Sequence, residues 1–495
     1  MKLFNKLHIL IIGLATFTSC ESLDQDPYED LSTKLAFKSV ENAEYWRNGF
    51  YRSLRGVSYG DIMLLPDVQS DLLNATLNYG NRKGDLQNWS FRTNDSDISF
   101  VWSSRYSVLN DINICIEKFP TIPVSSDKEQ DKLNRFLGEA YALRAYYFFQ
   151  LTERFSPKYD ASNKSTANLG IPLVTTFDIT LLPPRATLEE TYNQIESDID
   201  KAEKLLGGAE GVKGSNFFTL DAVKALKARV ALTKGDYEKA YVEAKAIVDA
   251  GKYPLVSTQE ALQKMWHNDE TDETIVQLFS SKPDELPLLM RDYLVYEAKT
   301  KKYKPDYVPS KWVVDLYDAS DIRKSVYFKN LTIETPTGKD YDVTLVYKYP
   351  GNPNLYSGSP LEYHSPKIFR TAELYLIASE AAYKNGDEVN AVKYLNDLRQ
   401  SRGLSDVKSS GINLFNDIKE ERLRELAFEG TRLNDLKRWE EGVKRHSPQG
   451  TEYLVVSPKD QYYELDKPAN DYRFTWPIPN HEMTVNPNLK QNEGY

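Results

Sequence analysis

Pairs of amphipathic helices joined by short glycine turns are the feature that most restricts how this chain can fold. Two such pairs are expected, over 220–234 with 237–250 and over 371–384 with 388–402. Gly235-Asp236 and Asn385-Gly386-Asp387 separate the partners, and glycine is the residue that most often follows the end of a helix. The pattern is typical of tetratricopeptide-like helical hairpins, although a strict repeat of about 34 residues is absent.

Further helices and few strands complete the prediction. Apolar residues recur every third or fourth position over 133–151, which predicts a long helix, and Arg144 on this stripe should have a buried carboxylate partner. A capping box at 187–190 predicts a helix from there to Leu206. The best strand signal is 343–349. We therefore expect a mainly α protein with tetratricopeptide-like helical hairpins, long irregular insertions and a few short strands.

Two long stretches, 61–94 and 280–311, lack a helical pattern and are rich in turn-forming and aromatic residues. Loops longer than about 12–15 residues are uncommon and are usually functional or disordered. The aromatic residues favour a functional role. These two insertions are therefore where we look for a binding site.

The beginning of the chain has the pattern of a bacterial lipoprotein signal. Lys2 and Lys6 precede a short apolar segment over 9–17, which is far below the ~20 residues needed to span a bilayer. Thr18-Ser19-Cys20 resembles a lipobox, which implies cleavage of 1–19 and lipidation of Cys20. The one other cysteine, Cys115, lies in an apolar segment and is expected to be a small buried hydrophobic residue.

Composition and motifs exclude several classes of function. The chain has 62 Lys and Arg against 72 Asp and Glu, a net charge of −10, so a basic nucleic-acid-binding face is not expected. No histidine pair has metal-ligand spacing, and the Gly-x-Ser-x-Gly, P-loop and dinucleotide-binding patterns are absent from the sequence. The sequence does not exclude a pair of carboxylates arranged as in a glycosidase. We predict no enzymatic activity and no cofactor; the acidic loops permit calcium but show no EF-hand spacing.

The C-terminal half carries a recognisable pattern. Residues 424–439 read Arg-Glu-Leu-Ala-Phe-Glu-Gly-Thr-Arg-Leu-Asn-Asp-Leu-Lys-Arg-Trp, which closely resembles the signature of the SusD/RagB family. Further similar segments are 144–148, 235–240, 369–381, 477–482 and 486–495. The resemblance runs over 20–495. It implies a SusD-like N-terminal part over 20–270 and a C-terminal part over 271–495, packed as one globular unit.

The resemblance also implies a function and a location. SusD-like lipoproteins are non-catalytic binding proteins that cap a SusC-like TonB-dependent outer-membrane barrel and hold an oligomeric nutrient over its mouth. We therefore expect a lipid-anchored protein of the outer membrane that captures oligosaccharides and delivers them to such a barrel. Glu21, Asp24 and Asp26 resemble the signal by which Bacteroidetes-type lipoproteins reach the cell exterior. The helical hairpins are expected to face the barrel, with the ligand on the opposite side.

A sugar chain needs flat aromatic platforms for its apolar ring faces and polar side chains for its hydroxyls. The two insertions and the edge of the second supply the candidate ligand-binding residues: Trp89, Tyr296, Trp312, Tyr303, Asp71, Asn74 and Arg82. Trp89, Tyr296 and Trp312 are expected to share one shallow exposed surface for a neutral or weakly charged oligosaccharide. The charged signature residues over 425–435 are instead expected to form an internal ion-pair network.

Two alternatives stay open at this stage. A SusD-like protein could bind peptides rather than glycans, and nothing in the candidate residues decides between them. A helical-repeat scaffold without a small ligand would co-purify with the barrel but give no titration signal with any oligosaccharide. The identity of the glycan, its linkage and its chain length do not follow from the sequence.

Overall fold

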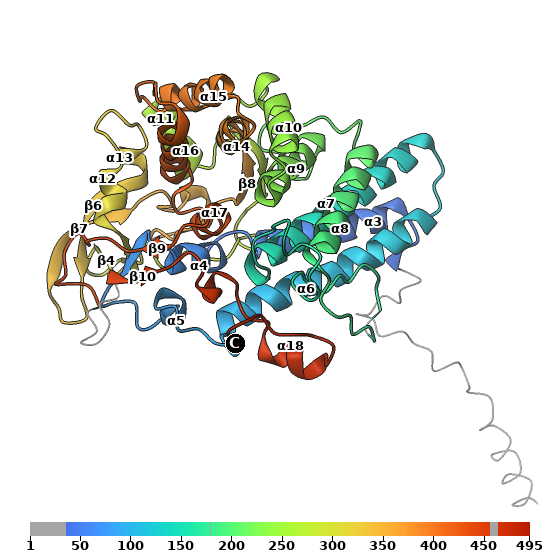
Figure 1. The fold of residues 1–495 in the computed structure, drawn as a ribbon, viewed down its shortest axis with the longest axis horizontal. Coiled ribbons are helices and arrows are strands. Elements are labelled where there is room, and N and C mark those ends of the chain that lie inside the picture. The colour runs from blue at the N-terminus through green and yellow to red at the C-terminus, as the bar shows by residue number, and fades with distance from the viewer. Residues whose placement is uncertain (1–35, 179, 456–463) are drawn as a thin grey trace, which may run out of the picture.

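The computed structural model describes residues 36–178, 180–455 and 464–495, and it is predominantly helical (Figure 1). The first helices are α3 (Val40–Arg55), α4 (Asp61–Gln69), α5 (Gly84–Gln87), α6 (Ser96–Lys118), α7 (Asp127–Phe155) and α8 (Leu188–Leu205). Cys20 and the signal segment predicted over 1–19 lie outside the described residues. Among the helices described, none is both long and apolar enough to cross a membrane.

The predicted helical hairpins are confirmed. They are α9 (Leu220–Lys234) with α10 (Tyr237–Asp249), and α14 (Thr371–Lys384) with α15 (Glu388–Ser401). Gly235 and Gly386 take the left-handed conformation at the turns, with φ of +85° and +81°, which explains why glycine is required there. α10 packs against both α9 and α14, so the two hairpins form one continuous stack (Figure 1).

The remaining described helices are shorter on average than the four of this stack. They are α11 (Gln259–His267), α12 (Lys311–Asp315), α13 (Lys324–Tyr327), α16 (Gly411–Leu426), α17 (Arg432–Trp439) and α18 (Asn480–Val485). One cluster of buried apolar side chains includes residues from both parts of the chain, from Phe37 to Leu489. The division expected at residue 270 stays a prediction.

The long helix α7 packs against α3, α6 and α8. Arg144 on α7 has the buried carboxylate partner that its position predicted, because Asp198 of α8 accepts from its Nε and Nη2 at 2.7 Å each. The capping box at the start of α8 is also confirmed, since Thr187 and Glu190 hydrogen-bond each other's backbone N–H. These contacts fix α8 along α7.

The strands are short, and some of their pairings join segments that are far apart in the sequence. They are β1 (Leu73–Ala75), β2 (Thr274–Gln277), β3 (Tyr296–Glu297), β4 (Lys302–Tyr303), β5 (Tyr307–Pro309), β6 (Phe328–Glu334), β7 (Asp340–Val346), β8 (Lys367–Arg370), β9 (Val443–Lys444) and β10 (Asp466–Lys467). The largest sheet has the order β3-β4-β6-β7, and the pairs β1-β5, β2-β8 and β9-β10 are antiparallel. The strand predicted over 343–349 overlaps β7.

The prediction that 61–94 is irregular throughout is wrong at its beginning. Residues 61–69 form α4 in spite of Pro66, because Leu64, Leu65 and Val68 are buried and their packing outweighs the one backbone hydrogen bond that proline removes. β1 then pairs with β5, so the two insertions meet.

A network of buried ion pairs holds the signature segment, as the sequence predicted. Glu425 accepts from Arg323 at 2.8 Å, from Arg370 at 2.5 Å and from Arg402 at 3.0 Å, and all four side chains are buried. Burial alone would raise the pKa of Glu425, but the Arg402, Arg370 and Arg323 guanidiniums hold it well below its usual range. Arg402 directly follows α15, Arg370 ends β8, and Arg323 directly precedes α13.

Gly430 forms the close contact between this segment and the N-terminal part. Its φ is +72°, and a Cβ added there would lie 2.5 Å from the carbonyl oxygen of Met63 in α4. Its N–H donates to Asp67 Oδ2 at 2.9 Å. Only glycine allows this approach of two backbones.

Arg432 gives a test of the structural role of the signature segment. Its Nε and Nη2 donate to Asp71 Oδ1 and Oδ2 at 3.0 and 2.8 Å, and both side chains are largely buried. Arg432→Ala should lower the free energy of unfolding by about 3–5 kcal/mol, because it leaves a buried carboxylate without its partner. Urea denaturation measures this change.

The matched control is Lys245→Ala, which removes an exposed ion pair with Asp249 on α10. It should change the free energy of unfolding by no more than about 0.5 kcal/mol. Equal stability of Arg432→Ala and the control would contradict the structural assignment.

Candidate functional site

The two insertions come together at one end of the molecule. β1 from the first insertion pairs with β5 from the second, and Thr76 Oγ1 donates to the carbonyl oxygen of Pro305 at 2.6 Å. In Figure 1 this region, with β4, β6 and β7, lies at the opposite end from α3 and α8 and beside α12 and α13. Residues more than 200 positions apart therefore build one surface.

Half-buried tyrosines gather on this surface. Tyr296 and Tyr303 face each other across β3 and β4, with ring centroids 5.3 Å apart. Burial raises the pKa of Tyr303 to about 12, with smaller effects of Tyr347 and Tyr296 in the same direction. We call Tyr296, Tyr303, Tyr347 and Tyr356 the tyrosine surface.

Basic side chains border the tyrosine surface. Lys329 Nζ lies 4.6 Å from the ring centroid of Tyr347, and Lys282 Nζ donates to the carbonyl oxygen of Tyr356 at 3.1 Å. The half-exposed rings offer apolar faces, while the lysines and the neutral phenol groups offer hydrogen-bond donors. The arrangement can bind a ligand that has both apolar faces and hydroxyl groups.

Trp312 lies at a separate position on the same end of the protein. It is half-buried on α12, its Nε1 donates to the carbonyl oxygen of Asp71 at 3.2 Å, and its ring is 5.0 Å from the exposed ring of His446. Within the described residues, no ring contact or hydrogen bond joins Trp312 to Tyr296 or Tyr303. The expectation that Trp312 and Tyr296 serve one ligand surface stays a prediction.

The expectation that Trp89 is exposed is wrong. Its side chain is 2% exposed, its Nε1 donates to the carbonyl oxygen of Gln69 at 2.7 Å, and its ring packs edge-on against Phe474 at 5.0 Å. Leu433, Leu436 and Val443 complete this apolar cluster. Residues from the C-terminal part cover the tryptophan, and no local pattern around residue 89 announces them.

The polar candidates are only partly available to a surface ligand. Asp71 and Asn74 are 4% and 2% exposed, because Asp71 pairs with Arg432 and Asn74 Oδ1 accepts from Ser310 at 3.0 Å. The expectation that these two present polar atoms on the surface is wrong. Arg82 is exposed over 57% of its side chain, but its guanidinium is held by buried Asp306.

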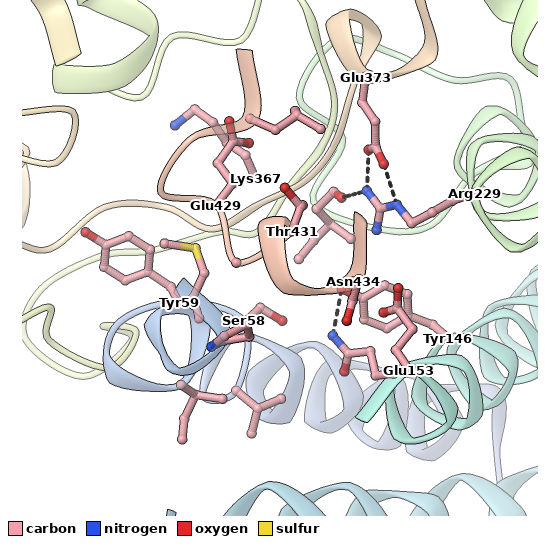
Figure 2. Close-up of a pocket in the computed structure, with 18 of the residues that line it drawn as sticks. Ser58, Tyr59, Tyr146, Glu153, Arg229, Lys367, Glu373, Glu429, Thr431 and Asn434 are labelled. Atoms are coloured by element: carbon pink, nitrogen blue, oxygen red, sulfur yellow. Dashed lines mark hydrogen bonds and ion pairs between the residues drawn. The ribbon is translucent and has the colours of Figure 1, made fainter. Parts of the chain in front are cut away.

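A cavity of about 180 Å³, which the sequence did not indicate, lies between α4, α7, α9, β8 and α17 (Figure 2). We call it the junction cavity. Its wall includes Tyr59, Tyr146, Glu153 and Asn434, and Arg229, which donates to Glu373 Oε1 at 2.8 Å. The lining residues come from at least eight separate elements, so no sequence motif could have identified them.

In the described part of the chain, no three His, Cys, Asp or Glu side chains are arranged to hold a metal ion. The carboxylates instead pair with arginine and lysine, as the network around Glu425 illustrates.

Comparison with models of known families identifies the family of this chain. Residues 254–495 match the SusD family model, and residues 23–232 match a model described as starch-binding associating with outer membrane. The chain belongs to the SusD/RagB family. The resemblance in the signature segment is confirmed.

Individual SusD-like proteins are similar over nearly their whole length. SusD-like protein P38 of Formosa agariphila is 24% identical over 100% of both chains. A SusD superfamily protein from Bacteroides thetaiotaomicron is 26% identical with a TM-score of 0.77, covering 92% of this chain and 99% of that one. A putative sugar binding protein from Bacteroides vulgatus is 25% identical with a TM-score of 0.75, covering 93% and 99%.

The contact between Asp67 and Gly430 gives a pH-dependent prediction for this SusD-like protein. Burial raises the pKa of Asp67 from 3.8 to about 7, so the folded state holds a proton that the unfolded chain has released. The free energy of unfolding contributed by this group therefore falls as the pH rises from ~4 to ~7. Asp67→Asn keeps an acceptor for Gly430 and removes the titration.

The melting temperature of Asp67→Asn, relative to the wild type, should accordingly increase with pH across this window. Calorimetry at several pH values measures it. The exposed Asp131→Asn on α7 is the control, and its difference from the wild type should stay constant. If the melting temperature of Asp67→Asn relative to the wild type were also independent of pH, the raised pKa assigned to Asp67 would be contradicted.

Proposed function

We propose that this SusD/RagB protein binds an oligosaccharide on the tyrosine surface and delivers it to a SusC-like TonB-dependent outer-membrane transporter. The observation that carries the proposal is the Tyr296–Tyr303 pair, which lies half-exposed where the two insertions meet. Family membership supports glycan binding, since one matched family model is described as starch-binding and a similar structure is a putative sugar binding protein.

The chemistry of the tyrosine surface favours a neutral or weakly charged glycan. Aromatic rings stack against the apolar C–H faces of sugar rings, and phenol and ammonium groups donate to hydroxyls. The net charge of −10 repels strongly anionic chains at long range. Lys282 and Lys329 are local hydrogen-bond donors at this surface. Trp312 and exposed Arg82 extend the proposed surface.

Attachment and partnership follow from the sequence and the family. We propose that Cys20 carries the lipid, that the mature protein is anchored in the outer membrane facing the cell exterior, and that it is not an enzyme. The stack of α9, α10, α14 and α15 lies apart from the tyrosine surface (Figure 1). This separation supports a hairpin face for the barrel and an opposite face for the ligand.

Peptide binding is the second candidate, because tyrosine surfaces also accommodate peptide side chains and backbone amides. A glycan array against a peptide pool separates the two. A scaffold without a small ligand predicts no signal in either experiment while the barrel still co-purifies.

Variants of the tyrosine surface test the binding site. Tyr296→Ala and Tyr347→Ala should each weaken glycan binding several-fold, because one aromatic contact contributes about 0.5–1.5 kcal/mol beyond its buried area. The double variant should nearly abolish binding and melt like the wild type. Isothermal titration with the glycan found by the array gives the affinities.

Two further variants are matched controls for this test. Tyr45→Ala removes a tyrosine that is 64% exposed on α3, far from the site, and should bind normally. Trp89→Ala should lower the free energy of unfolding by about 3–5 kcal/mol, because it empties a buried site. Full-strength binding by the folded double variant would exclude the tyrosine surface while leaving the family assignment intact.

The lipid anchor is tested by Cys20→Ser. Without the thiol no lipid can be attached. The protein should then leave the membrane fraction, because the acyl chains on Cys20 are its proposed anchor and firm attachment needs more than one of them. Protease treatment of intact cells tests the location. Full protection until the cells are lysed would place the wild-type protein on the periplasmic side and contradict the proposed orientation.

A further inference from the structure

The junction cavity has the chemistry of a second binding site, and we infer that it takes a small neutral polyhydroxylated ligand such as a single sugar ring. It shares no residue with the tyrosine surface, so the inference goes beyond the proposed function. Its residues come from both parts of the chain and meet around α17 (Figure 2). The argument rests on the hydrogen-bonding groups that the protein leaves without partners.

Two acceptors on the cavity wall have no donor. Ser58 Oγ and Gln150 Oε1 are buried without a hydrogen-bond partner, and the half-buried carboxylate of Glu153 also lines the cavity. In Figure 2, Glu153 lies beside Tyr146 and Asn434. Buried polar groups in native proteins almost always have a partner, so two such acceptors around one cavity point to a hydrogen-bond donor that the protein itself does not supply.

The same wall has donors to spare. Arg422 donates to Asp435 through Nε at 2.8 Å, but its buried Nη1 has no partner. Arg105 donates to Ser104 Oγ and to the carbonyl oxygen of Val57 and, among the described residues, pairs with no carboxylate. Burial lowers the pKa of Arg105 to about 10, which reflects this lack of a counter-charge.

This mixture of groups selects the class of ligand. An anion without a proton to donate would leave Ser58 Oγ and Gln150 Oε1 without a donor, and a cation without a lone pair would leave Arg422 Nη1 without an acceptor. A hydroxyl group donates and accepts, so a molecule with several hydroxyls can satisfy both sets. Ile62, Met63 and Leu232 supply apolar wall for ring carbons.

The volume limits the size. The cavity volume of about 180 Å³ is smaller than the ~300–1,000 Å³ of sites for drug-sized ligands, so it suits a ligand of one ring better than a chain. A hollow of about 20 Å³ shares Glu153, Thr233 and Asn434 with the cavity and continues to Lys158, which pairs with exposed Glu440. The cavity therefore lies next to the outer surface.

Titration of the full chain with small ligands tests the inference. The probes are D-glucose, D-galactose, D-mannose and glycerol, with sulfate as the anionic arm. At least one sugar or polyol should raise the melting temperature and give a one-site isotherm, and sulfate should do neither. Binding of sulfate alone, or of none of these probes, would overturn the inference, and the second result would mean that the cavity holds water only.

Variants locate the binding. Ser58→Leu fills the cavity without removing a hydrogen bond and should abolish binding of the small probe, whereas Ser53→Leu, at a half-buried serine of α3 outside the cavity, should leave it unchanged. Gln150→Leu should weaken it about tenfold, the effect of one lost hydrogen bond. If Ser58→Leu does not fold, Gln150→Leu alone tests whether the small probe binds in the junction cavity.

The tyrosine-surface double variant keeps the two proposals distinguishable. It should lose the oligosaccharide and still bind the small probe at full strength. Probe binding that survives both Ser58→Leu and Gln150→Leu would overturn the cavity site. Probe binding lost in the tyrosine-surface variant would place it at the oligosaccharide site instead.

Discussion

The carboxylate of Glu425 is the point on which the C-terminal half of this protein is organised. Three guanidiniums converge on it, and two of them, from Arg370 and Arg402, also reach Glu273. A buried charge is tolerated only when it is paired, so these side chains must all arrive together. The requirement fixes β8, α15 and α16 relative to one another and places Gly430 against α4.

The hairpin stack and the signature network divide the work of stabilising the fold. The stack of α9, α10, α14 and α15 depends on small apolar side chains such as Ala225 and Ala381, which are completely buried. The ion-pair network fixes the relative orientation of the elements that it joins, because ion pairs with two hydrogen bonds have a strict geometry. Between these two systems lies the junction cavity, where the pairing of polar groups is incomplete.

Local sequence predicted local structure well. The bounds of α9 and α14 follow from apolar spacing and from the glycine at each turn, and the start of α8 follows from Thr187 and Glu190. The need of Arg144 for a carboxylate could also be predicted, although its identity as Asp198 could not, because that depends on how two helices pack.

The candidate site could be predicted only in outline. The two insertions that the sequence indicated pair with each other through β1 and β5, and Tyr296 and Tyr303 lie half-exposed together there. The prediction that Trp89 is exposed is wrong because Phe474 and Leu433, more than 300 residues away, cover its side chain. The prediction that Asp71 presents its carboxylate on the surface is wrong because that carboxylate pairs with Arg432, which is also distant in the sequence. Whether an aromatic or charged residue in a loop faces solvent is decided by distant segments, which no local pattern contains.

The pairing of β1 with β5 has a consequence for how the protein comes into being. Asn74 and Ser310 are 236 residues apart in the sequence, and the contact between them can form only after both have emerged and folded. Contacts of such long separation form late, because the entropy of closing the loop must be overcome first. The end of the protein that carries the tyrosine surface is therefore expected to assemble last, and a chain that is cut short before Ser310 lacks the pairing of β1 with β5.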